Sequence, residues 1–177
     1  SQARLFYFVK DATYAYGFKT WQDNNLMYAS YANAYAFGAF LVRNYGGAKL
    51  FYEICHNDYV NEDSIVNAIN KINNTELTFN DLLKEFCYIL ANTDNSDKDL
   101  PSLNKSVSST LSGFTYDLDA INLAKLPVAT EYEIRFDTTE SITHRYLGGY
   151  GFNYLKFDTP TDVDITFFNE NLIIEYN

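Results

Sequence analysis

The chain of 177 residues is poor in histidine, cysteine and basic side chains. Its two histidines are His56 and His144, and no His-Glu-x-x-His motif occurs. A zinc peptidase needs three clustered protein ligands and a general base, which this sequence does not present. Gly-x-Ser-x-Gly is absent too, so acyl transfer has no recognisable nucleophile. We therefore expect no catalytic residue, metal ligand or cofactor in this chain itself.

Positive charge is also scarce. Thirteen Lys and Arg face 23 Asp and Glu, which gives a net charge of −10. Phosphate binding needs clustered basic residues, so the charge argues against nucleic acid and against an anionic membrane surface. The longest apolar stretch, 26–42, is interrupted by Asn33 and several hydroxyl groups. It falls short of the ~20 apolar residues of a membrane span, so we predict none.

Only two cysteines occur, Cys55 and Cys87. Each has apolar neighbours in a stretch that we expect to be helical, so we interpret both as buried free thiols. A single bridge between packed helices is the alternative if the protein is secreted, because disulfides persist in oxidising compartments. Neither has a second cysteine close in sequence, which disfavours metal binding by these thiols.

The amino-terminal sequence Ser1-Gln2-Ala3-Arg4 has no initiator methionine and no signal-peptide pattern. It is interpreted as a trimmed boundary or as the start of a fragment, and in both cases we expect further sequence upstream.

Hydrophobic residues make up 47% of the chain, with 16 Tyr and 14 Phe, which is ample for a packed core. Apolar residues recur at helical spacing up to about residue 92, and strand-like alternation dominates later. We predict an α+β protein with a helical subdomain over 1–92, a linker over 93–113 and an antiparallel β-sandwich over 114–177. The predicted helices cover 3–10, 27–44, 48–56, a segment starting at 61, and a segment from 78 to 91.

Local signals support these helices. Ala29, Ala32, Ala36 and Ala39 form a slim face for close packing, and Gly46-Gly47 ends the second helix. Thr78 supplies a capping oxygen for the last one. In the second half, alternation predicts strands at 131–136, 141–147, 152–157, 163–168 and 171–176, the last two joined as a hairpin.

A resemblance to a known family rests on aromatic and glycine patterns. They are Trp21, the stretch from Tyr28 to Leu41, Tyr45-Gly46-Gly47-Ala48-Lys49-Leu50, Leu77 to Phe86, and Leu147 to Tyr154. The helical half resembles the C-terminal helical subdomain of hyicolysin-like, gluzincin-type bacterial zinc metallopeptidases. The second half looks like the small β-sandwich attached to many secreted bacterial proteases. The resemblance implies that zinc and the catalytic motif lie in an upstream segment of the same protein, which would be this chain's partner.

Four aromatic residues around a glycine-rich turn, Tyr146, Tyr150, Phe152 and Tyr154, are candidate binding residues. Exposed together, they would stack against a sugar or a peptide; buried, they would belong to the core. The glycines at 148, 149 and 151 lack the strand-to-helix context of a nucleotide loop, and we interpret them as a turn.

Two clusters of aspartates are candidate calcium ligands, and the two histidines are the other residues that could bind a metal. Asp158, Asp162 and Asp164, or Asp94, Asp97 and Asp99, would present hard oxygen ligands, but neither set matches a known calcium loop, which favours a solvated turn and linker. We interpret His144 as an ordinary strand residue and His56 as a helix-end residue favoured by the helix dipole.

Two functional hypotheses follow. The chain is the non-catalytic C-terminal part of a secreted or cell-surface metallopeptidase, buttressing an upstream active site and helping to dock substrate. Alternatively, it is a freestanding glycan- or protein-binding module that uses the aromatics of its β domain. A scaffold without a ligand is a third interpretation.

Overall fold

The computed structural model describes residues 2–11, 13–93, 100–126, 136–137, 148–152, 154–155, 163–168 and 171–176. Five α-helices occupy its first half: α1 (Gln2–Lys10), α2 (Met27–Asn44), α3 (Ala48–His56), α4 (Asn61–Asn73) and α5 (Phe79–Ala91). Short 3-10 turns are η1 (Thr13–Tyr16), η2 (Asn24–Leu26) and η3 (Leu123–Lys125). The helices predicted from periodicity are confirmed, nearly residue for residue.

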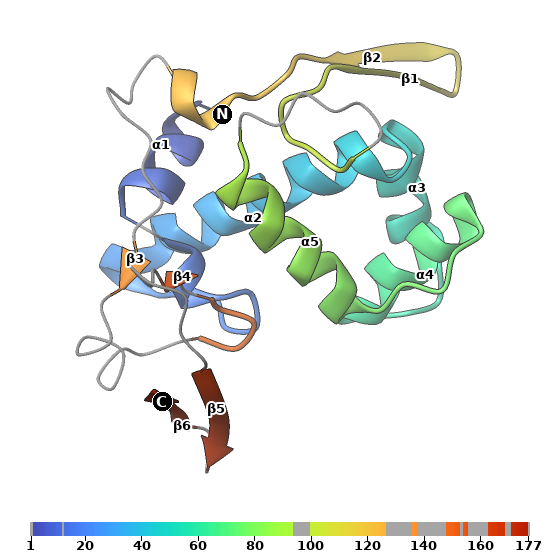
Figure 1. Ribbon diagram of the computed structural model, residues 1–177. Helices are drawn as coiled ribbons and strands as arrows, with labels where there is room; N and C mark the ends of the chain where they lie inside the picture. Colours follow the sequence, from blue (N-terminus) through green and yellow to red (C-terminus); the bar gives the residue numbers. More distant parts are fainter. Residues whose placement is uncertain are drawn as a thin grey trace.

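Helix α2 is the central element. Figure 1 shows it crossing the molecule behind α5, with α1 at one end and α3 and α4 at the other. Ala29, Ala32, Ala36 and Ala39 are all buried, which confirms the slim face. Small side chains let the neighbouring elements approach the α2 backbone closely, and the large aromatic residues fill the space around them.

The core combines aliphatic side chains with a group of packed aromatic rings, which centres on the fully buried Phe86 of α5. Its ring contacts five others: Phe8, Phe18, Phe37, Phe40 and Phe152. Segments outside the helices also contribute to this core, through Leu103, Leu123 and Leu126. The second half of the chain therefore packs onto the helices rather than standing apart from them.

One buried polar group ties α2 to the segment before it. Asn33 is almost fully buried and accepts a hydrogen bond from Thr13 Oγ1 at 2.8 Å. Its amide also donates to the carbonyl oxygens of Thr13 and Gly17, both at 2.9 Å. These three bonds satisfy the amide inside the core, as a buried polar group requires.

The helix ends follow the sequence signals. Thr78 and Asp81 form a full capping box at the start of α5, so the predicted cap is confirmed. Gly46 and Gly47 have φ angles of 124° and 62°, which only glycine adopts easily, and they separate α2 from α3.

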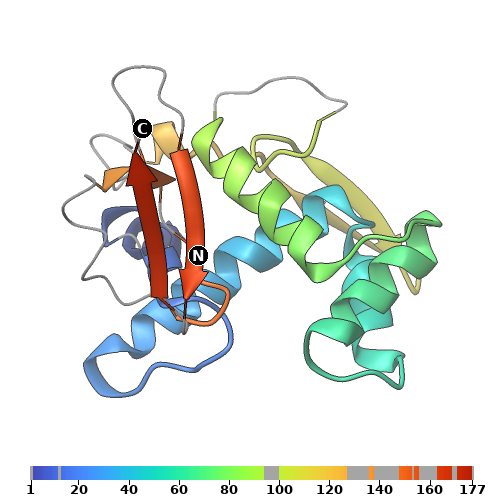
Figure 2. The same cartoon turned by 60° about the horizontal axis from the view of Figure 1, so that its bottom comes forward.

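The described strands form three separate pairs. β1 (Val107–Leu111) and β2 (Phe114–Leu118) are antiparallel, β3 (Phe136–Asp137) and β4 (Tyr154–Leu155) are parallel, and β5 (Val163–Phe168) pairs antiparallel with β6 (Asn171–Tyr176). The hairpin predicted over 163–176 is confirmed. Both views place it on the side of α1, β3 and β4, away from α3 and α4 (Figures 1 and 2).

The fold is therefore mixed α+β, and the described strands do not assemble into a sandwich. Of the other predicted strands, 131–136 is described only at Phe136 and 152–157 is a strand at Tyr154–Leu155. The strand predicted over 141–147 lies outside the described residues.

The segment 93–113, predicted as a linker, contains ordered structure in its second part. Ser102 and Leu103 are buried, and β1 begins at Val107. The serine-rich composition suggested turns, but Ser and Thr also suit an exposed strand once a partner supplies the hydrogen bonds. That partner is β2, which follows directly after the Ser112-Gly113 turn.

The cysteines are free thiols, as predicted, but they are less buried than predicted. Cys55 is exposed on α3, and Cys87 is half-buried on α5, where burial raises the pKa of the thiol to about 11. The alternative, a disulfide bridge between packed helices, is not observed. Within the described residues, no helix is long and apolar enough to cross a membrane.

Candidate functional site

An open groove runs along α2 on the face opposite its alanine core. It consists of two hollows that share Ala34 and Gly38 of α2 and Phe51 of α3. The first hollow has a volume of about 590 Å³ and the second about 380 Å³. Ala34 and Gly38 lie one turn apart on α2, and their small side chains leave space above the helix backbone. The half-exposed ring of Phe51 lines both hollows.

The first hollow has an apolar floor with a polar rim. Its apolar residues come from four helices and the segment before α2: Phe18, Phe37, Leu41, Phe51, Ile54, Ile65 and Phe79. A concave, mainly aromatic surface with a few polar groups is the usual form of a binding site. Gly38 gives the hollow its depth, because a methyl group there would lie 3.8 Å from the ring of Phe51.

Three side chains form the polar rim. Tyr150 donates its hydroxyl to Glu62 Oε1 at 2.8 Å, and Lys19 Nζ lies 3.2 Å from the same oxygen. The Lys19 ammonium also sits 5.1 Å from the centre of the Tyr150 ring. Such an exposed ion pair contributes little to stability, so its main effect is to orient Tyr150 over the hollow.

The electrostatics of this rim are mutually consistent. The pKa of Glu62 is lowered, first by its own backbone amide and then by the hydrogen bonds from Tyr150 and Lys19. The hydrogen bond to Glu62 raises the pKa of Lys19 and is also the largest cause of the raised pKa of Tyr150. At neutral pH the rim therefore contains one anion, one cation and a neutral phenol.

The glycine-rich loop around Tyr150 is a turn, as predicted, and it docks directly on the chain before α2. Gly148 N donates to Ala15 O at 3.0 Å, and Gly149 O accepts from the backbone amides of Phe18 and Lys19. A Cβ atom on Gly148 would overlap the carbonyl of Tyr16. Glycine is needed here because two backbones meet without side chains between them.

Tyr150 itself has a φ of 62°, a conformation that bulky residues rarely adopt. Such a residue costs on the order of 1–3 kcal/mol and persists where surrounding contacts hold it. Here the docked loop and the hydrogen bond to Glu62 are those contacts. Tyr150, the residue with this strained backbone, also lines the first hollow.

Of the four aromatic candidates, the three that the structure describes do not form one exposed platform. Phe152 stacks on Tyr14 with centroids 5.2 Å apart, and Tyr154 donates its hydroxyl to Cys87 O at 2.7 Å. Both rings pack against the core, while Tyr150 faces the first hollow. Tyr146 lies outside the described residues, so ligand stacking stays a prediction for Tyr146 and Tyr150.

The calcium candidates lie mostly outside the described residues. These are Asp158 and Asp162, together with Asp94, Asp97 and Asp99; Asp164 belongs to β5 and is paired in register with Glu175. His144 is outside them too. In the described part of the chain, no group of three His, Cys, Asp or Glu side chains is placed to hold a metal ion.

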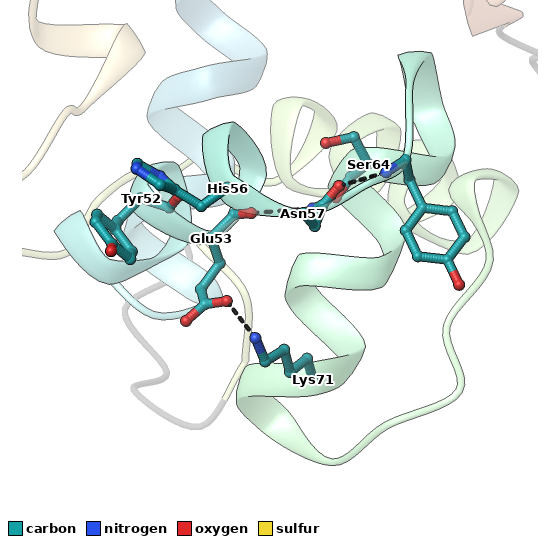
Figure 3. A network of polar contacts seen from close by, with 7 residues as sticks. Tyr52, Glu53, His56, Asn57, Ser64 and Lys71 are labelled. Atoms are coloured by element: carbon teal, nitrogen blue, oxygen red, sulfur yellow. Dashed lines mark hydrogen bonds and ion pairs between the residues drawn. The ribbon is translucent and has the colours of Figure 1, made fainter.

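His56 behaves as a helix-end residue (Figure 3). Its Nδ1 lies 2.7 Å from the carbonyl of Tyr52, one turn earlier, and the two rings stack with centroids 4.0 Å apart. Beside it, Asn57 donates to the carbonyls of Glu53 and Ser64, and Lys71 pairs with Glu53 at 2.7 Å. The bonds of Asn57 and Lys71 join α3 to α4. The contacts of His56 with Tyr52 fit its interpretation as a helix-end residue.

Sequence reasoning missed the groove. The spacing Ala34-x-x-x-Gly38 on a helix whose opposite face already carries four alanines was the available signal. Small residues on both faces of one helix indicate that something else must fill at least one of them. Lys19 and Glu62 were not detectable, because they are 43 residues apart and no local pattern links them.

No protein-family model, curated protein or solved structure matches this chain.

Proposed function

We propose that this chain is the non-catalytic C-terminal part of a bacterial zinc metallopeptidase and that the α2 groove supports an upstream catalytic segment. The observation that carries the proposal is the open apolar face of α2, which lies within the stretch that resembles the C-terminal helical subdomain of that family. The zinc ligands and the general base would belong to the upstream segment.

The exposure of α2 supports this role. Met27 and Tyr31 are 42% and 44% exposed, and they continue along the helix to Ala34 and Gly38. Trp21 packs edge-on against Tyr31 with centroids 5.0 Å apart, which widens the apolar surface. A helix that is apolar on both faces is normally covered on both, so this continuous surface fits a packing partner.

The chain's own residues would act by packing. The first hollow accepts apolar side chains of the upstream segment, and the rim of Lys19, Glu62 and Tyr150 offers hydrogen bonds at its edge. In this proposal the β-rich region 114–177 aids stability or substrate docking, and the whole protein is secreted or displayed at the cell surface.

The test uses the longer polypeptide encoded by the gene. We expect a His-Glu-x-x-His motif within a few dozen residues upstream, stoichiometric zinc, and chelator-sensitive hydrolysis of a protein substrate. Residues 1–177 alone should show no such hydrolysis. An upstream sequence without zinc ligands, or chelator-sensitive cleavage by the 177-residue chain alone, would refute the proposal.

A matched pair of variants tests the groove itself. Ala34→Glu puts a charge in the groove, and Ala91→Glu puts one at an exposed position at the end of α5. Both should leave the free energy of unfolding of the 177-residue chain within about 0.5 kcal/mol. In the longer protein, Ala34→Glu should lower the specific activity at least tenfold, which corresponds to a rise of about 1.4 kcal/mol in the activation free energy. Ala91→Glu should leave the specific activity unchanged. Equal activities would contradict docking in the groove.

A freestanding binding module is the second candidate, and the strained Tyr150 at the rim favours it. In this case Tyr150→Ala would abolish binding of a glycan or peptide ligand by the 177-residue chain, and Phe152→Leu would not. Secretion of the chain directly behind a signal peptide, without a catalytic segment, would favour this candidate over the first.

A further inference from the structure

Arg43, in the last turn of α2, is a buried cation. Its side chain is 8% exposed, and its guanidinium has two hydrogen-bond acceptors, both backbone carbonyls. Nη1 donates to Ala39 O at 3.0 Å and Nη2 to Asp119 O at 2.6 Å. Nε is buried and has no acceptor within the described part of the chain.

The positive charge of Arg43 is incompletely compensated. The ion pairs recorded among the described residues do not include it, so no described carboxylate lies within 4.0 Å of the guanidinium. Burial lowers the pKa of Arg43, and the nearby Tyr35 and Asp119 oppose this only in part. Buried charges are normally paired, because an uncompensated one costs several kcal/mol. A guanidinium has five N–H donors, so Arg43 has donors left for a ligand.

The second hollow adjoins this side chain. It lies between α2, α3 and the β1–β2 hairpin, and its walls are mainly apolar: Ala34, Gly38, Ala39, Val42, Ala48, Phe51 and Leu118. Arg43 is the one charged residue among its lining residues, and Tyr35 and Tyr116 add phenol groups. Its volume of about 380 Å³ is within the range of small-molecule sites.

We propose that the second hollow binds a free organic acid with an apolar body, whose single carboxylate accepts hydrogen bonds from the Arg43 guanidinium. The apolar body lies against Val42, Phe51 and Leu118. The ligand supplies the negative charge that the protein does not provide, and the hollow supplies the apolar contact.

The charges around Arg43 select a monoanion. Asp117 and Asp119 line a third hollow that Arg43 also lines, and the chain carries a net charge of −10. A dianion such as phosphate would be repelled by these groups and would find little polar surface in the second hollow. A carboxylate with a hydrocarbon tail matches both the single cation and the apolar walls.

The experiment titrates the 177-residue chain with three probes that have the same tail: octanoate, octanol and octylammonium. Binding is measured by calorimetry and by the shift of the thermal unfolding midpoint at neutral pH. We expect octanoate to bind at least tenfold more tightly than octanol, since charge-assisted hydrogen bonds are the stronger kind, and octylammonium to bind more weakly still. Equal binding of octanoate and octanol would overturn the proposal.

Two further probes in the same titration test which class of ligand binds. Inorganic phosphate should not bind, and the apolar peptide acid N-acetyl-Leu-Leu should bind more weakly than octanoate. Tighter binding of the peptide acid would overturn the assignment to free organic acids and would point to a peptide C-terminus. Neither measurement involves peptidase activity, so the result for ligand binding is independent of the function proposed above.

Substitutions in the two hollows test where the ligand binds. Arg43→Met keeps the length of the stem without the charge and should lose the preference for octanoate over octanol while remaining folded, because replacing a buried charge with an apolar side chain is often neutral or stabilising. Arg43→Lys keeps the charge with fewer donors and should weaken octanoate binding several-fold; unchanged affinity in either variant would refute the role of Arg43. Ala48→Leu fills the second hollow and should abolish binding. Ile65→Phe, its control in the first hollow, should not.

Discussion

The helical region and the β1–β2 hairpin are ordered by different forces. The helices surround a core in which Phe86 is fully buried and contacts five aromatic rings. In the hairpin, by contrast, Phe114 is 69% exposed and Tyr116 46% exposed, and nearly every residue of β2 faces solvent. Figure 1 shows the hairpin extending along one edge beside α3.

The hairpin depends on its ladder and its attachment. Five residue pairs of β1 and β2 are in antiparallel register, and Ser112 and Gly113 both have the positive φ angles that a tight hairpin turn needs. Ser109 Oγ accepts a hydrogen bond from Ala48 N at 2.9 Å, which anchors β1 to the start of α3. A lone two-stranded hairpin is marginally stable in water, so this attachment matters more than burial. Burial energy therefore concentrates in the helical region.

The largest expected effect is at the centre of that region. Phe86→Ala removes a fully buried ring and should lower the free energy of unfolding by about 3–5 kcal/mol, because the surrounding rings cannot fill the cavity. Urea unfolding followed by circular dichroism measures the loss. The conservative Phe86→Leu should cost clearly less. A loss under 1 kcal/mol for Phe86→Ala would mean that the aromatic core is loosely packed and the contrast between the two regions is false.

The same contrast explains which parts of the fold the sequence could predict. The helices were predictable because their signals are local: the alanine spacing on α2, the glycines at 46 and 47, and the Thr78 cap each lie within a few residues of the element that they define. The hairpin β5–β6 was predictable for the same reason. Strand β1 was missed because its Ser- and Thr-rich sequence has no apolar alternation and its anchor on Ala48 lies about 60 residues away, although the Ser112-Gly113 turn to β2 is local.

The candidate site shows the same limit. Tyr150 was predicted from the cluster of aromatics around glycines, and it does line the first hollow. The other members of that cluster could not be sorted by sequence, because alternation does not say which face of a short strand meets the helices. Arg43 carries no sequence signal of burial at all, since its environment is made by β2 and the residues after it, about 75 positions later.

A buried polar link gives the second prediction. Asn33→Leu is close in volume but leaves the hydroxyl and carbonyl of Thr13 and the carbonyl of Gly17 without their partner. It should lower the free energy of unfolding by about 1–3 kcal/mol, the cost of unsatisfied buried polar groups. The control is Asn80→Leu, at an exposed position of α5, which should change little. If both variants unfold at the same urea concentration, the link from α2 to η1 does not stabilise the fold.

A surface cap gives a smaller and pH-dependent effect. Thr78→Ala removes the capping oxygen at the start of α5 and should cost about 1 kcal/mol at neutral pH. Hydrogen bonds from the Thr78 side chain and then from its backbone hold the pKa of Asp81 below 3.8. A carboxylate with a lowered folded pKa stabilises the fold above its unfolded pKa, and this contribution disappears as the pH falls through the folded pKa.

The difference in unfolding free energy between wild type and Thr78→Ala should therefore shrink as the pH falls below about 3.8. Urea titrations at a series of pH values measure it, with Asp81→Asn as the control in which the pH dependence is already absent. A difference that stays constant down to acid pH would show that the reciprocal Asp81 bond does not contribute.

The smallest expected effect is in the hairpin. Phe114→Ala removes a ring that is 69% exposed, so the free energy of unfolding should change by no more than about 0.5 kcal/mol. This is the direct counterpart of Phe86→Ala: the same substitution, in the same urea experiment, at the opposite extreme of burial. A loss above 2 kcal/mol would show that the ring of Phe114 is covered in solution. The two regions would then both depend on burial, with the cover of the hairpin supplied by another molecule or by a part of the chain beyond the described residues.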